Sequence, residues 1–216
     1  MSGYVPLNER PQGGHTRLLE LTLSDGPRDV LDVGCSSGYL AAPLAAAGAR
    51  VVGLELDPDA AEAARTYCAE VLVGDVEGME LPFGPASFDA IVCGDLVEHL
   101  RDPGTTLARL RPLLRHGGRL VLSTPNVANW AMRLSLLAGR WRYTERGILD
   151  RTHAHLFTRK TLTETVEAAG YRILELDHTA PVPLFGTPAV ERAAHAIARL
   201  RPSLLAYQFV LAATPR

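Results

Sequence analysis

The stretch Val30–Leu40, VLDVGCSSGYL, determines how the rest of the chain is interpreted. Its first four residues form a short apolar run typical of a β-strand, and the segment from Tyr39 to Ala47 is rich in helix-forming residues. Gly34 and Gly38 flank the turn between the two segments. Glycines let a backbone pass close to a ligand, and free N–H groups at the start of a helix attract an anion. A strand, a glycine turn and a helix in this order predict a nucleotide-type site at the edge of an open parallel sheet.

The turn itself, Gly34-Cys35-Ser36-Ser37-Gly38, fits three interpretations. A dinucleotide site usually carries three glycines as G-x-G-x-x-G, so the two glycines here disfavour a nicotinamide cofactor. The turn also matches G-x-S-x-G, the nucleophile elbow of α/β-hydrolases, but such elbows follow several earlier strands and this turn lies near the start of the chain. The third interpretation is a plain strand–helix connection that binds no ligand. The choice among the three depends on motifs elsewhere in the chain.

Composition favours a globular enzyme. The 216 residues are 47% hydrophobic and 21% charged, which suits one α/β domain with a full core. A net charge of −2 provides no basic field, so nucleic acid is not an expected partner. Three cysteines without a C-x-x-C pair argue against a disulfide framework or a zinc site. No segment reaches the roughly 18 apolar residues of a membrane span, and we expect a cytoplasmic monomer or homodimer without membrane insertion.

Strand and helix patterns alternate through the first part of the chain. We expect strands at 29–33, 50–54, 70–73, 88–93 and 119–123, and helices at 15–23, 39–47, 58–68 and 104–114, with a turn at Gly117-Gly118. Strands separated by helices of this length pair in parallel through right-handed crossovers. The later part is predicted to form helices at 127–138, 161–169 and 188–200, and strands at 171–177 and 204–213.

An acid follows the second predicted strand at the position expected for a ribose contact. Glu55 lies 21 residues after Gly34, and a carboxylate there can accept hydrogen bonds from both hydroxyls of a ribose diol. Asp57 is the competing candidate, but it directly precedes Pro58 and is therefore better explained as the N-cap of a helix. We favour Glu55 for the ribose.

Several motifs of the chain resemble those of a known family. VLDVGCSSGYLA resembles motif I of the class I S-adenosylmethionine-dependent methyltransferases, and further landmarks follow in order over residues 28–178. The resemblance implies a three-layer, doubly wound α/β sheet of the Rossmann-like methyltransferase type, mostly parallel, with an antiparallel last strand inserted between strands 5 and 6. Helical additions would follow strand 5 and separate strands 6 and 7. We expect one domain, 1–216, with an N-terminal arm (1–27), a cofactor-binding core (28–124), an acceptor-covering insertion (125–160) and a C-terminal part (161–216).

The resemblance implies S-adenosylmethionine as cofactor, S-adenosylhomocysteine as product and a small-molecule acceptor. Asp32 would help to hold the ammonium of the methionine part, usually through water. The backbone N–H groups of Gly34, Ser36 and Gly38 would face its carboxylate, and Gly94 would line the same side.

The adenosine part is expected at the next two strand ends. Besides Glu55 on the ribose, Asp75 resembles the family acid that accepts a hydrogen bond from the adenine amino group, and the backbone N–H of Val76 would face the ring. In isolation, Gly74-Asp75 would be explained as a turn alone.

The stretch after the fourth strand is expected to border the transferring methyl group. Leu96–Leu100 followed by Asp102-Pro103 resembles the family pattern x-x-E-H-x-x-D-P. His99 titrates near neutrality and suits a general base, although Glu98 and His99 would equally serve to order this loop. Asp95, Glu98 and His99 also resemble the Glu-x-x-Glu-His metal ligands of quinone-ring O-methyltransferases, with Asp in place of the first Glu. A divalent metal is an alternative here, but it is not the expected cofactor.

The acceptor is expected to lie under the insertion. The segment Asp150–Thr158 resembles the family pattern D-R-T-H-x-R-F-F-T, in which His153 would touch the acceptor or act as base. The predicted substrate contacts are Tyr4, Asn126, Trp130 and Trp141. The sequence therefore predicts methyl transfer to a small molecule, most simply at a hydroxyl oxygen of a specialised metabolite, a sugar or a quinone-like compound. The alternatives are an N-methyltransferase and a non-catalytic cofactor-binding protein of the same fold.

Overall fold

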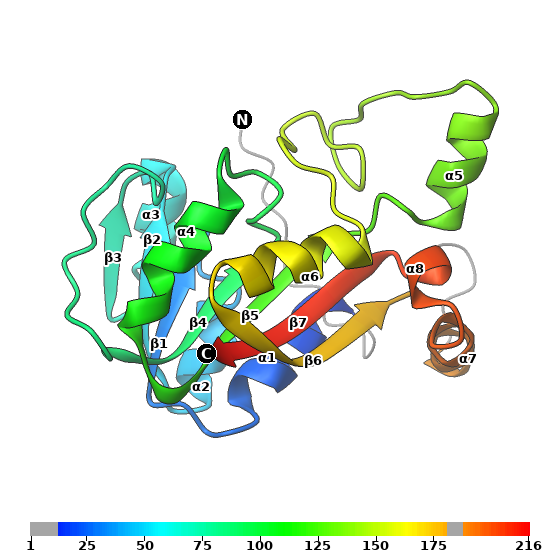
Figure 1. The fold of residues 1–216 in the computed structure, drawn as a ribbon. Coiled ribbons are helices and arrows are strands. Elements are labelled where there is room, and N and C mark those ends of the chain that lie inside the picture. The colour runs from blue at the N-terminus through cyan, green and yellow to red at the C-terminus, as the bar shows by residue number, and fades with distance from the viewer. Residues whose placement is uncertain (1–12, 181–187) are drawn as a thin grey trace.

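The computed structural model describes residues 13–180 and 188–216; Tyr4 lies outside these ranges. Within them, seven strands form one sheet in the order β3-β2-β1-β4-β5-β7-β6 (Figure 1). Strands β3 to β5 pair in parallel, whereas β7 is antiparallel to both β5 and β6. The predicted fold, including the last strand between the fifth and the sixth, is confirmed. The strands are β1 (Asp29–Val33), β2 (Arg50–Glu55), β3 (Glu70–Val73), β4 (Phe88–Gly94), β5 (Leu114–Pro125), β6 (Tyr171–Thr179) and β7 (Gln208–Pro215).

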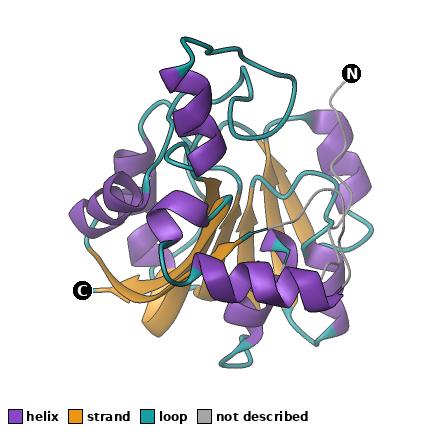
Figure 2. Ribbon diagram, turned by 90° about the vertical axis from the view of Figure 1, so that its right-hand side faces the viewer, coloured by secondary structure: helices purple, strands orange, loops and turns teal. Residues whose placement is uncertain are grey.

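Helices cover both faces of the sheet (Figure 2). One face packs against α4 and α6, and the other against α1, α2 and α3. The remaining helices, α5, α7 and α8, lie beyond the β6 side of the sheet (Figure 1). The helices are α1 (Gly14–Leu23), α2 (Ala41–Ala46), α3 (Pro58–Ala64), α4 (Pro103–Leu110), α5 (Trp130–Leu137), α6 (Arg159–Ala168), α7 (Pro188–Ala198) and α8 (Pro202–Leu205), with a short 3-10 turn at Arg111–Leu113.

The central strand β1 shows why the sheet has two cores. Val30 packs into the core under α1 and α2, while Leu31 and Val33 pack into the core under α4 and α6. Side chains of a strand alternate between the two faces, so a strand buried on both faces needs an apolar residue at nearly every position. Asp32 is the exception, and it is 1% exposed.

The predicted turn at Gly117-Gly118 is instead part of β5. The strand begins at Leu114 and its pairing with β4 shifts between Phe88 and Ala90, so that extra residues of β5 bulge out of the ladder. Gly117 has a φ of +79°, which a glycine adopts without strain. The glycine pair therefore marks a bulge in the strand.

Several predicted helix ends also differ from those in the structure. The helix predicted at 39–47 begins only at Ala41, and the one predicted at 58–68 ends at Ala64. The last strand begins at Gln208 rather than at residue 204, because Pro202 starts the short helix α8. α5 begins at Trp130, where the side chain of Asn129 accepts a hydrogen bond from the N–H of Ala131 as an N-cap.

We expect Tyr171→Phe to lower the free energy of unfolding by about 1 kcal/mol, the usual net value of a buried hydrogen bond. The fully buried Tyr171 hydroxyl donates to the backbone oxygen of Leu107 at 3.0 Å and so ties β6 to α4. Urea denaturation measures the change, and Tyr143→Phe at an exposed position is the control. Equal stability of the two variants would show that the bond contributes nothing.

Candidate active site

The carboxyl ends of the parallel strands meet at one edge of the sheet, where open α/β sheets bind ligands. The motif loop after β1 turns sharply there, with φ of +73° at Gly34 and +81° at Gly38. A Cβ on Gly34 would lie 3.0 Å from the side chain of Leu96, and one on Gly38 would lie 3.2 Å from the backbone of Ala64. Both positions require glycine, because φ is positive and because a Cβ would come too close to its neighbours.

The backbone N–H groups of this loop are bonded within the protein. Gly34 donates to the oxygen of Leu54 at 2.7 Å and Gly38 donates to the oxygen of Cys35 at 2.9 Å. Ser36, whose φ is +49°, donates to the carboxylate of Glu55 at 2.8 Å. The contact of these three N–H groups with a ligand carboxylate stays a prediction. The tight left-handed turns direct them back to β2 and to the loop itself.

Glu55 fastens the end of β2 to the motif loop. Its carboxylate accepts hydrogen bonds from the N–H groups of Ser36, Leu56 and Asp57 at 2.8 to 2.9 Å. Asp57 is the N-cap of α3 and accepts from the N–H of Asp59, as its position before Pro58 predicted. Glu55 is thus the acid that stands at the end of β2, beside the loop.

Asp32 is a buried carboxyl group with unsatisfied bonding capacity. Its Oδ2 has no hydrogen-bond partner among the described residues. Burial, together with the negative charge of Glu55, raises the pKa of Asp32 to about 7. A buried acid of this kind is stabilised by a cation that reaches it. The residues at this edge therefore fit a ligand that carries an ammonium group.

Asp75, at the end of β3, is held by an arginine that sequence analysis did not single out. Its Oδ2 lies 2.7 Å from Nη2 of Arg101, and its Oδ1 accepts from the N–H of Glu77 at 2.9 Å. Val76, which follows, is buried. A ligand amino group that approaches Asp75 has to share this carboxylate with Arg101. The signal in the sequence was the position of Arg101, two residues after His99.

Asp95, after β4, is bonded to the other half of the sheet. The Ser123 hydroxyl on β5 and the Gln208 amide on β7 both donate to its Oδ1. Gly94 before it has little space, since a Cβ there would lie 3.0 Å from the side chain of Leu40. Asp95 is therefore turned to Ser123 and Gln208, and no pattern in the sequence indicated Gln208.

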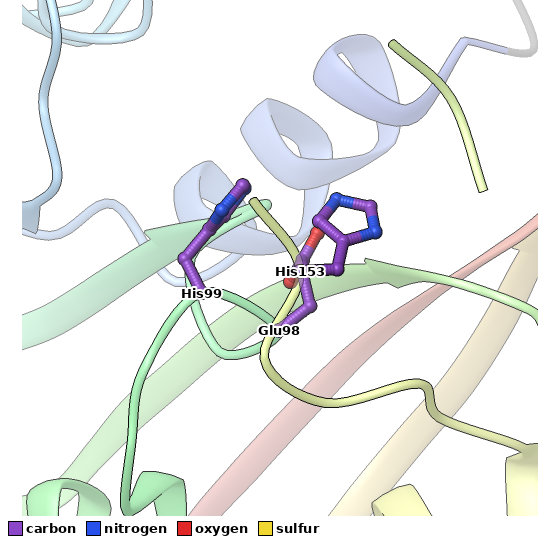
Figure 3. A group of neighbouring side chains, drawn as sticks. All are labelled: Glu98, His99 and His153. Carbon is purple, nitrogen blue, oxygen red and sulfur yellow. The ribbon is translucent and has the colours of Figure 1, made fainter. Parts of the chain in front are cut away.

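Glu98, His99 and His153 lie together above the sheet edge, at the ends of two loops (Figure 3). Their potential ligand atoms all lie within 4.8 Å of one another, and the two imidazole rings meet edge to face with centroids 4.8 Å apart. Glu98 and His99 of the predicted metal set are therefore joined by His153, and Asp95 is not a member of the group. Two imidazole nitrogens and a carboxylate oxygen suit a divalent transition metal as well as acid–base chemistry.

The two histidines are oriented by backbone oxygens. Nδ1 of His153 lies 3.1 Å from the oxygen of Ile148, and Nδ1 of His99 lies 3.3 Å from the oxygen of Thr152. A carbonyl oxygen only accepts, so each Nδ1 carries the proton and each Nε2 keeps its lone pair. Burial and the neighbouring His153 lower the pKa of His99, which favours its neutral form.

Glu98 is the buried member of the group, at 1% exposure. Burial, and after it the charge of Asp95, raises the pKa of Glu98 well above its usual range. Neither carboxyl oxygen has a hydrogen bond of normal geometry among the described residues, although the nearby Thr124 hydroxyl acts to lower this pKa. Burial and the charge of Asp95 thus favour the neutral form of the Glu98 carboxyl group, and a cation that reaches it would favour the carboxylate.

Comparison with known proteins identifies the family. A family model described as a methyltransferase domain matches residues 7–176. The chain is a class I S-adenosylmethionine-dependent methyltransferase.

Curated relatives agree with this family. The methyltransferase is 29% identical over 168 residues to a ubiquinone biosynthesis O-methyltransferase of Aeromonas salmonicida, covering 71% of this chain and 67% of the relative. It is 35% identical over 131 residues to a protein of the same name from Xylella fastidiosa, covering 58% of this chain and 52% of the relative. The matches thus span between half and two thirds of these relatives.

Solved structures share the fold. A Thermotoga maritima protein described as a possible histamine N-methyltransferase superposes with a TM-score of 0.66 at 18% identity, covering 94% of this chain and 88% of that one. An S-adenosylmethionine-dependent methyltransferase of Mesorhizobium loti gives 0.65 at 18% identity, with 94% and 98% covered. None of the helices in the described ranges of the present methyltransferase has the length and apolar character that crossing a bilayer requires.

The predicted substrate contacts of the methyltransferase occupy different environments. Asn126 is fully buried, and its amide donates to the oxygen of Ala206 at 2.9 Å while its Oδ1 accepts from the N–H of Ala128. Asn126 joins the end of β5 to the chain before β7, and its contact with an acceptor stays a prediction. Trp130 and Trp141 remain accessible on the insertion.

We expect Asp32→Asn to change the pH dependence of stability in the ligand-free protein. The folded wild type keeps a proton on Asp32 up to a pKa of about 7, whereas the unfolded chain releases it near 3.8, so this group lowers stability as the pH rises between these values. Asparagine does not titrate, so the variant lacks this loss of stability. From pH 4 to pH 8, the free energy of unfolding of Asp32→Asn should therefore rise by about 2–4 kcal/mol relative to that of the wild type. Urea denaturation across this pH range measures the change, and Asp59→Asn at an exposed position is the control. If the free energy of unfolding depends on pH in the same way in the wild type and in Asp32→Asn, the burial argument is contradicted.

Proposed function

We propose that this methyltransferase transfers a methyl group from S-adenosylmethionine to a hydroxyl oxygen of a small-molecule acceptor. The observation that carries the proposal is the edge-to-face pair His99–His153, whose free Nε2 atoms lie beside the carboxyl edge of the sheet. A hydroxyl has to lose its proton on methylation, so a neutral imidazole within reach is what oxygen transfer needs. The names of the curated relatives support the same choice.

The acids at the strand ends suit the parts of the cofactor. Asp32 has the burial and the missing partner that an ammonium group would satisfy, and Glu55 stands where the ribose hydroxyls are expected. Asp75 would accept from the adenine amino group. When bound, S-adenosylmethionine supplies a methyl group already activated by its sulfonium. The protein therefore has only to align the acceptor, exclude water and take a proton.

His153 is the base in this proposal. Its Nδ1–H is fixed on the oxygen of Ile148, which points the Nε2 lone pair away from that anchor. His99 packs edge-on against it, and burial together with repulsion from His153 lowers the pKa of His99. A non-catalytic protein of this fold would not depend on either ring, and N-methylation would depend on them less.

Binding of S-adenosylhomocysteine tests the cofactor assignment. We expect Glu55→Gln and Asp75→Asn each to weaken binding roughly 10- to 100-fold, the effect of losing a hydrogen bond to a charged acceptor. Calorimetric titration measures it, with Glu62→Gln as the control because Glu62 is an exposed acid of α3 paired with Arg65. Melting temperatures of all variants show whether the Glu55 loop stays folded. Wild-type affinity in both site variants would overturn the assignment.

Turnover tests the base. In an acceptor screen, we expect His153→Gln to lower kcat about 100- to 1,000-fold, a typical contribution of general base catalysis, with S-adenosylhomocysteine binding unchanged. The wild-type rate should fall as the pH drops, because a protonated pair cannot accept a proton. His116→Gln is the control, since His116 lies on β5 near the opposite edge of the sheet. Full activity of His153→Gln, or wild-type activity that chelation abolishes, would reject the base and favour a metal at Glu98, His99 and His153.

A further inference from the structure

Two neighbouring cavities open between the insertion and the C-terminal helices. The first, which we call the apolar cavity, measures about 490 Å³ and lies between α5, α7 and α8. The second, the basic cavity, measures about 360 Å³ and lies between α5 and the loop that follows it. Met132, Ile148 and Tyr207 line both cavities, so the two are adjoining parts of one surface. Figure 1 shows α5 and α7 beyond the β6 side of the sheet.

The shared wall reaches the proposed base directly. Ile148, whose side chain lines both cavities, is the residue whose backbone oxygen lies 3.1 Å from Nδ1 of His153. Tyr207, the second shared residue, packs its hydroxyl against Gly147, where a Cβ would lie 3.2 Å from the oxygen. The next residue, Gln208, donates to Asp95 at the sheet edge. Ile148 and Tyr207 thus form the wall between the two cavities and the loops that carry His153 and Asp95.

The apolar cavity offers almost nothing to a polar ligand. Its walls are mainly apolar and carry no charged side chain: they include Trp130, Met132, Ile148, Ile197 and Leu205. The one side-chain amide there, Asn129, already donates to the oxygen of Ala206 and accepts from the N–H of Ala131. A sugar would leave its hydroxyls without partners in this cavity, at the cost of desolvation. An apolar body gains by leaving water there.

The basic cavity carries three cations without an acid. Arg140, Arg142 and Arg146 line it, and no carboxylate does. Within the described ranges, none of the three forms an ion pair, although the acid of the same loop, Glu145, pairs with Arg151. Guanidinium groups match the geometry of carboxylate and phosphate oxygens. Three of them around one hollow favour an anionic ligand.

We propose that the methyl acceptor is an amphipathic anion, with an apolar body in the apolar cavity and a carboxylate, phosphate or sulfonate group at the three arginines. This inference rests on the proposed function, since it names the acceptor class for the same histidine pair. It excludes free sugars as occupants of the apolar cavity, because their hydroxyls would find no partners there. The hydroxyl to be methylated would extend from between the two ends of the molecule past the wall formed by Ile148 and Tyr207, toward Nε2 of His153.

Two dyes that differ by a single sulfonate test the proposal. 8-Anilino-1-naphthalenesulfonate is the anionic probe and N-phenyl-1-naphthylamine is its neutral counterpart, and both report binding by fluorescence. With the protein saturated with S-adenosylhomocysteine, we expect one molecule of the anionic dye to bind about tenfold more tightly than the neutral dye, the usual gain from charge-assisted bonds. Sodium chloride should weaken only the anionic dye, because salt screens exposed charges.

Variants separate the two cavities. Ala194→Trp, which fills the apolar cavity from α7, should weaken both dyes at least about tenfold by steric exclusion. Ala196→Trp on the exposed side of the same helix is its control. Arg142→Ala/Arg146→Ala should weaken the anionic dye about tenfold and leave the neutral dye unchanged. Arg159→Ala/Arg172→Ala removes the same charge at exposed positions outside both cavities and should change neither.

The outcomes distinguish this inference from the proposed function. Equal affinity of the two dyes, or dye binding unaffected by Ala194→Trp, would overturn the acceptor class even if S-adenosylhomocysteine binds and methyl transfer occurs. Failure to bind S-adenosylhomocysteine would instead reject the proposed function. Vesicles of phosphatidylglycerol form a separate arm: if the two arginine changes abolish vesicle binding but leave the anionic dye unchanged, the arginines face a lipid surface and the proposal fails.

Discussion

The structure depends on one electrostatic constraint, the carboxyl group of Asp32 inside the central strand β1. It lies in the middle of a strand that is buried on both faces, and its Oδ2 has no partner among the described residues. A buried acid without a partner costs stability, and selection for packing alone would place an apolar residue there. In the proposed function, the ammonium group of the cofactor would offset this cost. The carboxyl group of Asp32 is thus unfavourable for packing of the core but would suit the ammonium group of the proposed cofactor.

The strand ends around Asp32 are connected to one another by a chain of side chains. Glu55 joins β2 to the motif loop, Arg101 joins the loop after β4 to Asp75 at β3, and Gln208 joins β7 to Asp95. Each link crosses between loops that are far apart in the sequence. Two of these links hold Glu55 and Asp75, the acids that the adenosine part of the cofactor would contact.

The proposed sites for the cofactor and for the methyl acceptor consist of different structural elements. The cofactor side is formed by strand ends and tight loops whose geometry the parallel sheet fixes. The proposed acceptor side would be formed by α5, the loop after it, α7 and α8, which lie outside the two packed faces of the sheet. Variation in those helices changes the acceptor surface without disturbing the core. This separation explains how one fold serves many acceptors and why the fold alone does not name one.

Local patterns of apolar residues, glycine and proline in the sequence predicted the parallel strands, the glycine loop, the N-cap role of Asp57 and the acids at the strand ends. The antiparallel last strand between the fifth and the sixth was expected only from the resemblance to the methyltransferase family. The sequence did not determine that Gly117-Gly118 forms a bulge, that the N–H groups of the motif loop are bonded internally, or that Asn126 is buried. Only the tertiary structure placed His153 beside His99 and Gln208 against Asp95, and only it joined an apolar cavity to three arginines. These contacts join residues about 50 to 110 positions apart or arise from packing between helices, and no local pattern encodes such distances.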